Sequence, residues 1–162
     1  KATTFGNLSV NKYQTAATSN VTRGLNAGGY DNKNEIEYIT IASEGNATDF
    51  GDLTTGREKL GALSSTTRSV FTGGYTSSNQ NVLDYITIAS TGNATDFGDL
   101  SAVSKEGSAV SNKTLALYHL DSDKIRLDKF TIASTGNATD WGDISKISIR
   151  EFSGSNSHGG IA

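Results

Sequence analysis

One ten-residue segment recurs through this chain of 162 residues. TIASTGNATD occupies residues 87–96 and again 131–140, while residues 40–49 read TIASEGNATD. The next letters continue the match, because ATDFGDL or ATDWGDI follows at offsets of 47 and 44 residues. A period of this length is typical of solenoids, propellers and arrays.

The beginning of the chain belongs to the same series. Residues 2–8 read ATTFGNL, which is the motif 45 residues earlier with Thr4 and Asn7 in place of the two aspartates. A unit of about 45 residues is therefore repeated about three and a half times. A repeat that is nearly invariant is most simply an element that forms the fold.

Each unit carries the pattern of four short β-strands. The clearest lie at 35–41, 82–89 and 126–132, where β-branched and aromatic residues alternate with polar ones. A Gly–Asn pair follows each and suits a tight hairpin, and the next strand carries Phe50, Phe97 or Trp141. Short strands are expected at 61–65 and 108–111, leading into 69–72 and 115–118. The fold class is therefore all-β.

A glycine doublet, a tyrosine and a later aromatic residue resemble the kelch repeat, which builds β-propellers. Two units carry this resemblance, with Gly28–Gly29, Tyr38 and Phe50, and with Gly73–Gly74, Tyr85 and Phe97. The third unit departs from it, because His119, Leu120 and Asp121 stand near the doublet position and Phe130 lies one residue past the tyrosine position.

The wording DYITIASTGNATDFGDL at 84–100 is similar to kelch-like repeats in structural and tail-fibre proteins of bacteriophages, particularly marine ones. This resemblance implies a virion component, which is an extracellular setting. It implies nothing about the ligand.

Kelch order makes the small-residue strand innermost and the aromatic strand outermost. On that order the chain is one repeat domain, 1–162, with an outer strand at 1–10, units at about 11–55, 56–102 and 103–146, and a partial unit at 147–162. Propellers have about four to eight blades. Three and a half blades do not close a ring, so we expect another chain or further sequence to complete it.

Charge and composition exclude several classes of function. A net charge of −3 with scattered charges offers no basic stripe for nucleic acid. No apolar run approaches the roughly 20 residues that span a membrane. Cysteine is absent and the two histidines, His119 and His158, lie in different units, so no transition-metal site is expected. No nucleophile elbow or Ser–His–Asp order is present, which predicts a protein without enzymatic activity or cofactor.

Three aspartate pairs, 49/52, 96/99 and 140/143, leave two interpretations open. Carboxylate oxygens suit calcium. Aspartate also stabilises turns by accepting a hydrogen bond from the backbone two residues on. We favour the turn, because the spacing lacks the alternating acids of a calcium loop and because Thr4 and Asn7 break the pattern.

One set of loops diverges between units. The loops between the third and fourth strands all read EGNA or TGNA, whereas the others read DNKN, TSSNQN and DSDK, or TTGREK, AVSKEG and SKISIRE. Strands that alternate in direction place the divergent loops on one face, where either recognition or mere tolerance explains the variation. Aromatic rings beside amides and carboxylates suit sugars. The candidate ligand-binding residues are Tyr30, Lys33, Asn34, Arg57, Tyr75, Asn79, Gln80, Lys105, Asp121 and Asp123.

The sequence thus leads to two functional hypotheses. The first is a non-enzymatic propeller module of a phage tail fibre that presents loops to a glycan or protein of the host surface. The alternative is a purely structural subunit without ligand. Both expect a homo-oligomer or contacts with other virion subunits.

Overall fold

The computed structural model describes residues 3–121 and 125–145. Twelve strands in these ranges form three four-stranded antiparallel sheets, called blades 1, 2 and 3. Blade 1 contains β1 (Ala16–Ser19), β2 (Arg23–Ala27), β3 (Glu35–Thr40) and β4 (Thr48–Asp52). Blade 2 contains β5 (Gly61–Ser64), β6 (Arg68–Thr72), β7 (Gln80–Thr87) and β8 (Thr95–Ser104). Blade 3 contains β9 (Ser108–Ser111), β10 (Leu115–His119), β11 (Arg126–Thr131) and β12 (Thr139–Asp143).

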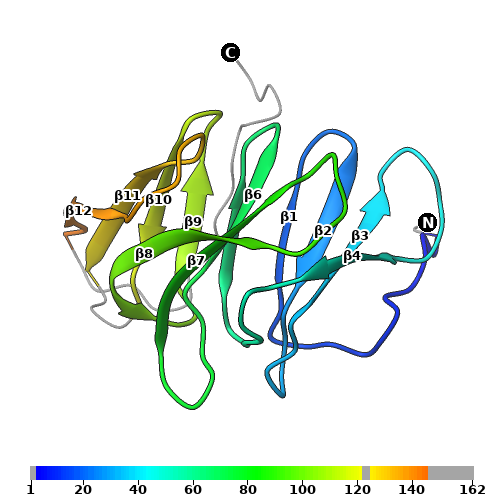
Figure 1. Cartoon of the computed structure of the whole chain (residues 1–162), viewed down its shortest axis with the longest axis horizontal. Coiled ribbons are helices and arrows are strands. Elements are labelled where there is room, and N and C mark those ends of the chain that lie inside the picture. The colour runs from blue at the N-terminus through cyan, green and yellow to red at the C-terminus, as the bar shows by residue number, and fades with distance from the viewer. Residues whose placement is uncertain (1–2, 122–124, 146–162) are drawn as a thin grey trace.

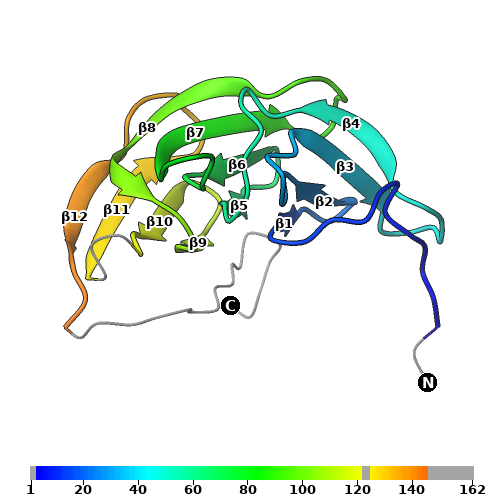
Figure 2. The same ribbon diagram turned by 90° about the horizontal axis from the view of Figure 1, so that it is seen from below.

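Within each blade the strands lie in chain order, and neighbours pair antiparallel. The first strands of the blades, β1, β5 and β9, lie along the inside of an arc, and β4, β8 and β12 follow its outside (Figure 2). The blades stand side by side as in a propeller (Figure 1). The described residues do not close into a ring.

The strands confirm the alternation seen in the sequence. β9 has the predicted bounds, and β3, β5, β6, β10 and β11 differ from the prediction by one residue at one end. β7 differs by two residues at each end. In each blade the pairing between the third and fourth strands changes register at a β-bulge. The bulge lies next to the pair that contains the glycine of the TDFGD or TDWGD segment. The bulge places that glycine at a positive φ, as at Gly51 and Gly98.

The core lies between blades, because each strand alternates side chains toward its two neighbours. Leu25 and Phe50 of blade 1 pack in one cluster with Phe71, Ile86 and Ile88 of blade 2. The opposite face of blade 2 packs on blade 3 in a second cluster. Each blade thus has a front face toward the next blade and a rear face toward the preceding one.

The repeated decapeptide joins neighbouring blades, which answers why it recurs. The hairpin loops 88–94 and 132–138 lie against the outer strand of the preceding blade, and loop 41–47 lies against residues 3–10. The amide N–H groups of Gly92 and Ala94 donate to the carbonyl oxygens of Phe50 and Asp52, at 2.7 Å each. The same two bonds join blade 3 to Phe97 and Asp99.

The Gly–Asn pair does not make the hairpin turn, which corrects the prediction. The turn lies earlier, where Ser90 N–H donates to the carbonyl of Thr87. Asn93 instead accepts a hydrogen bond on Oδ1 from the N–H of Asp52 in blade 1, and Asn137 accepts one from Asp99 in blade 2. Contacts with a neighbouring blade therefore explain why these asparagines recur. A sequence pattern within one unit does not reveal such contacts.

The predicted outer strand at the beginning of the chain also differs. Residues 3–10, called the arm, are not a strand, because no third strand of their own blade lies beside them. Their backbone instead accepts bonds from blade 1: Gly45 N–H donates to Phe5 and Ala47 N–H donates to Asn7. The arm therefore takes the place of an outer strand of a preceding blade. The predicted partial unit at 147–162 lies outside the described residues.

Candidate functional site

The divergent loops among the described residues lie on one face of the arc, called the loop face, as predicted. It carries the β2–β3 and β6–β7 loops and the segments that lead into β1, β5 and β9 (Figure 1, lower edge). Backbone bonds join them: Tyr30 N–H donates to Tyr13, and Glu58 and Tyr75 exchange two N–H···O bonds. The two kinds of loop are thereby fixed to each other in blades 1 and 2.

A second backbone feature links these loops from blade to blade. Gln14, Lys59 and Glu106 all have left-handed backbones, with φ of 58°, 57° and 56°. Lys59 N–H donates to the carbonyl of Gln14, and Glu106 N–H donates to that of Lys59. The Lys59 ammonium also bonds the Glu106 carboxylate at 2.9 Å, which raises the pKa of Lys59. The loop face is therefore supported by rigid connections rather than by isolated loops.

Two exposed tyrosines stack on this face. The rings of Tyr13 and Tyr30 lie with centroids 4.6 Å apart at 17° and are 57% and 51% exposed. Partial desolvation, followed by the nearby Tyr30, Glu58 and Asp31, raises the pKa of Tyr13. The phenol is therefore neutral at physiological pH and able to donate a hydrogen bond.

Blade 2 repeats this arrangement with different chemistry. Tyr75 is half-buried, and the Lys105 ammonium lies 4.8 Å from the centroid of its ring. Glu58 lies in the segment bridged to Tyr75. Aromatic rings, a carboxylate and an ammonium thus follow one another from the loops of blades 1 and 2 to the segment that leads into blade 3.

The other predicted ligand-binding residues have mixed positions. Asn34 is exposed and Lys33 half-buried in the β2–β3 loop, where their carbonyls accept bonds from Leu53 and Arg57. Gln80 uses its side-chain amide inside its own loop, with Thr76 and Ser78.

Asn79 and Asp121 complete this comparison. Asn79 is half-buried and bridged to Tyr75. Asp121 is half-buried and donates its amide N–H to the hydroxyl of Ser104. Asp123 lies outside the described residues. The structure thus gathers Tyr30, Tyr75 and Lys105 on the loop face, with Tyr13 and Glu58 beside them.

Arg57 differs from the expectation of an exposed ligand contact. Its side chain is fully buried and pairs with buried Asp84 at 2.7 Å. The guanidinium also donates to the carbonyls of Gly73, Thr55 and Phe71. Four hydrogen bonds made inside the protein leave this residue a structural role between the loops.

The acid beside Arg57 belongs to a repeated set that the sequence analysis missed. Thr54 donates from both N–H and hydroxyl to Asp84, as Ser101 does to Asp128 in blade 3. In blade 1 Glu37 takes this position and accepts the N–H of Ser9 in the arm. The signal was present, because all three acids occupy one place in the repeat alignment.

The first aspartate of each repeated pair forms the predicted turn. Asp49, Asp96 and Asp140 each accept on Oδ1 the N–H of the glycine two residues on, at 3.0–3.2 Å. Among residues 3–121 and 125–145, no group of three or more His, Asp or Glu side chains is arranged to hold a metal ion.

Tyr13 and Glu58 are the loop-face residues that sequence reasoning overlooked. Together with Lys105 they occupy one position of the repeat, directly before the left-handed residues Gln14, Lys59 and Glu106. Aligning the three segments on the strand that follows each of them reveals this position, because the three residue types are different.

No protein-family model matches the chain, and a search of curated proteins finds no relative with significant sequence similarity. In the part of the chain that the structure describes, no helix is long and apolar enough to cross a membrane. The candidate site therefore stands on its own geometry: exposed aromatic rings and charged groups on a rigid face.

Proposed function

We propose that the chain is a non-enzymatic, kelch-like propeller module of a bacteriophage particle, in a tail fibre or similar appendage, that presents its loop face to a glycan of the host surface. The observation that carries this proposal is the pair of exposed, stacked tyrosines beside Tyr75, Glu58 and Lys105. The repeat wording supplies the phage setting.

Sugar recognition suits this chemistry. The apolar face of a pyranose packs on an aromatic ring, while its hydroxyls need donors and acceptors at the ring edges. Tyr30 offers an exposed ring and a hydroxyl, and Glu58 and Lys105 offer a charged acceptor and donor. Because backbone bonds hold the loops in place, binding would order few further groups.

The test is binding to a glycan array and to host cells. Tyr30→Ala and Tyr75→Ala should each reduce binding at least about tenfold, a loss typical of one aromatic contact. Val21→Ala is the control, since this 66% exposed side chain lies in the β1–β2 turn at the opposite edge. Unchanged binding by both tyrosine variants would exclude the loop face as the recognition site.

A purely structural role is the second candidate. It is favoured by the exposed front face of blade 3, where Trp141 is 55% exposed although Phe50 and Phe97 at the same repeat position are 2% exposed. Under this role, assembly persists in variants that lose every loop-face contact, and no glycan binds.

A further inference from the structure

The two ends of the blade array expose faces that are covered inside it. On the front face of blade 3, Trp141 and Leu115 are 55% and 42% exposed. With Val110, Leu117 and Lys129 they line a hollow of about 430 Å³. The equivalent surfaces of blades 1 and 2 are covered by the blade that follows them.

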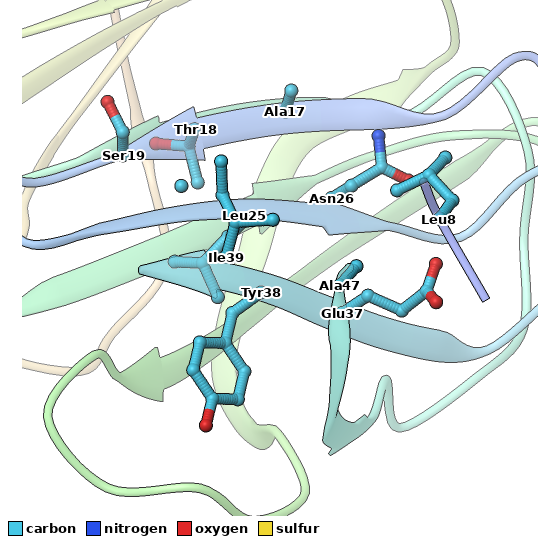
Figure 3. A pocket seen from close by; sticks show the side chains of 11 residues that line it. Leu8, Ala17, Thr18, Ser19, Leu25, Asn26, Glu37, Tyr38, Ile39 and Ala47 are labelled. Atoms are coloured by element: carbon cyan, nitrogen blue, oxygen red, sulfur yellow. The ribbon is translucent and has the colours of Figure 1, made fainter. Parts of the chain in front are cut away.

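The rear face of blade 1 is likewise exposed where the rear faces of blades 2 and 3 are covered. Ile41 is 44% exposed, whereas Ile88 and Ile132 at the same repeat position are fully buried. A hollow of about 440 Å³ lies over Gly24, Asn26 and Ile39 (Figure 3). In blade 2 the corresponding Ser69, Phe71 and Ile86 pack against blade 1.

We propose that the front face of blade 3 docks on the rear face of blade 1 of a second copy of this chain, and that the arm caps part of this rear face until it is displaced. The chain contains two copies of the required interface, between blades 1 and 2 and between blades 2 and 3. The docking is independent of ligand binding at the loop face.

The segment of blade 3 that would dock resembles in sequence the arm that it would displace. The arm reads TTFGNLS at 3–9, and TDWGDIS stands at 139–145. Phe5 and Asn7 accept the N–H groups of Gly45 and Ala47 through their carbonyls, and Ser9 donates to Glu37. Trp141, Asp143 and Ser145 occupy these positions in blade 3.

The glycine of this segment also has the backbone conformation that the contact between blades requires. A Cβ on Gly98 would lie 2.6 Å from the Gly136 backbone of the next blade, and one on Gly6 would collide with the Gly45 carbonyl oxygen. A Cβ on Gly142 meets no atom within 4 Å, although its φ of 142° matches the 139° of Gly98. Blade 3 therefore keeps the backbone shape that admits a hairpin loop, and none of the described residues occupies it.

Position 115 gives a test of this geometry. Arg23 and Arg68 occupy this place in blades 1 and 2 and donate to the carbonyls of Ile88 and Ile132 in the next blade, at 2.6 and 3.1 Å. Leu115→Arg should therefore keep or strengthen docking by reaching the Ile41 carbonyl of the second copy. Leu115→Glu places a charge of the wrong sign against the same carbonyl and should abolish it.

The experiment is native mass by light scattering over a range of protein concentrations, with circular dichroism to check folding. Deletion of residues 1–10 and Gly6→Val both release the arm. Each should raise the mass from that of one chain, which is 17.0 kDa for the full sequence, toward twice the one-chain value at a concentration roughly tenfold lower than the wild type needs. The described blades of two copies joined at both ends number six, within the range of known propellers.

Leu115→Glu in either arm variant should return the mass to that of one chain, whereas Leu115→Arg should not. The proposal is overturned if the arm variants keep the mass of one chain at every concentration, or if Leu115→Glu leaves their assembly intact. It is also overturned if release of the arm weakens assembly, because the arm would then contribute a strand to an incoming partner rather than cap the face.

Discussion

At the scale of single residues, one position of the repeat carries three different side chains, and their contacts differ between the blades. Lys12 pairs with Glu37 at 3.1 Å and Arg57 pairs with Asp84 at 2.7 Å, while Ser104 stands at this place in blade 3. In blades 1 and 2 the partner is the acid of the third strand. Further hydrogen bonds to this acid come from Ser9 of the arm in blade 1 and from Thr54 in blade 2, and Ser101 of β8 bonds the acid of blade 3.

Arg57→Met should lower the free energy of unfolding by about 3–5 kcal/mol, because it leaves Asp84 as an unpaired buried charge. Lys59→Met is the matched control, since this lysine pairs with Glu106 at a more exposed place and should lower the free energy of unfolding far less than Arg57→Met does. Urea unfolding measures both. Equal losses would contradict the structural role assigned to Arg57.

The glycines of the outer strands give a second prediction at this scale. Gly98 and Gly142 share the same backbone conformation, so an alanine is strained equally in both. Only Gly98→Ala also meets the backbone of a neighbouring hairpin loop. It should therefore cost roughly 1–3 kcal/mol more than Gly142→Ala in urea unfolding. Equal costs would mean that the close approach between blades is absent.

At the scale of elements, local pattern predicted the strands well and predicted their partners poorly. Alternation at 82–89 marks β7 to within two residues, because half-burial in a sheet leaves a period of two. The roles of Asn93 and the arm depend on a neighbouring blade, and that of Arg57 depends on Asp84, which lies 27 residues away in the same blade. No local signal carries that information, so these residues were interpreted as a turn, a ligand contact and a strand.

The arm gives a pH prediction at this scale. Burial alone would raise the pKa of Glu37, but hydrogen bonds from Ser9 and the Lys12 ammonium outweigh it and hold the pKa below its usual value. A lowered folded-state pKa adds stability above the unfolded-state pKa, which is lost as the pH falls through the folded value.

Wild-type protein should therefore lose more unfolding free energy between about pH 5 and pH 3 than Glu37→Gln, in which this position does not titrate. Urea unfolding at a series of pH values measures the difference. Parallel pH profiles for the two proteins would show that Glu37 is not held by the arm.

At the scale of the whole molecule, the invariant and the variable parts of the repeat lie on different surfaces. The decapeptide holds blade to blade through backbone bonds. The loops that differ gather on the loop face, and the faces left uncovered are those at the two ends of the arc (Figure 2). The proposed recognition surface and the proposed docking surfaces are thus different parts of the molecule.

The central claim is that the repeated segment is the joint between blades, and amide hydrogen exchange by NMR tests it most directly. The amides of Gly92, Ala94, Gly136 and Ala138 donate across blade boundaries, so they should exchange as slowly as strand amides although they lie in hairpin loops. Exchange at these four amides as fast as at exposed Thr135 in the same loop would contradict the account.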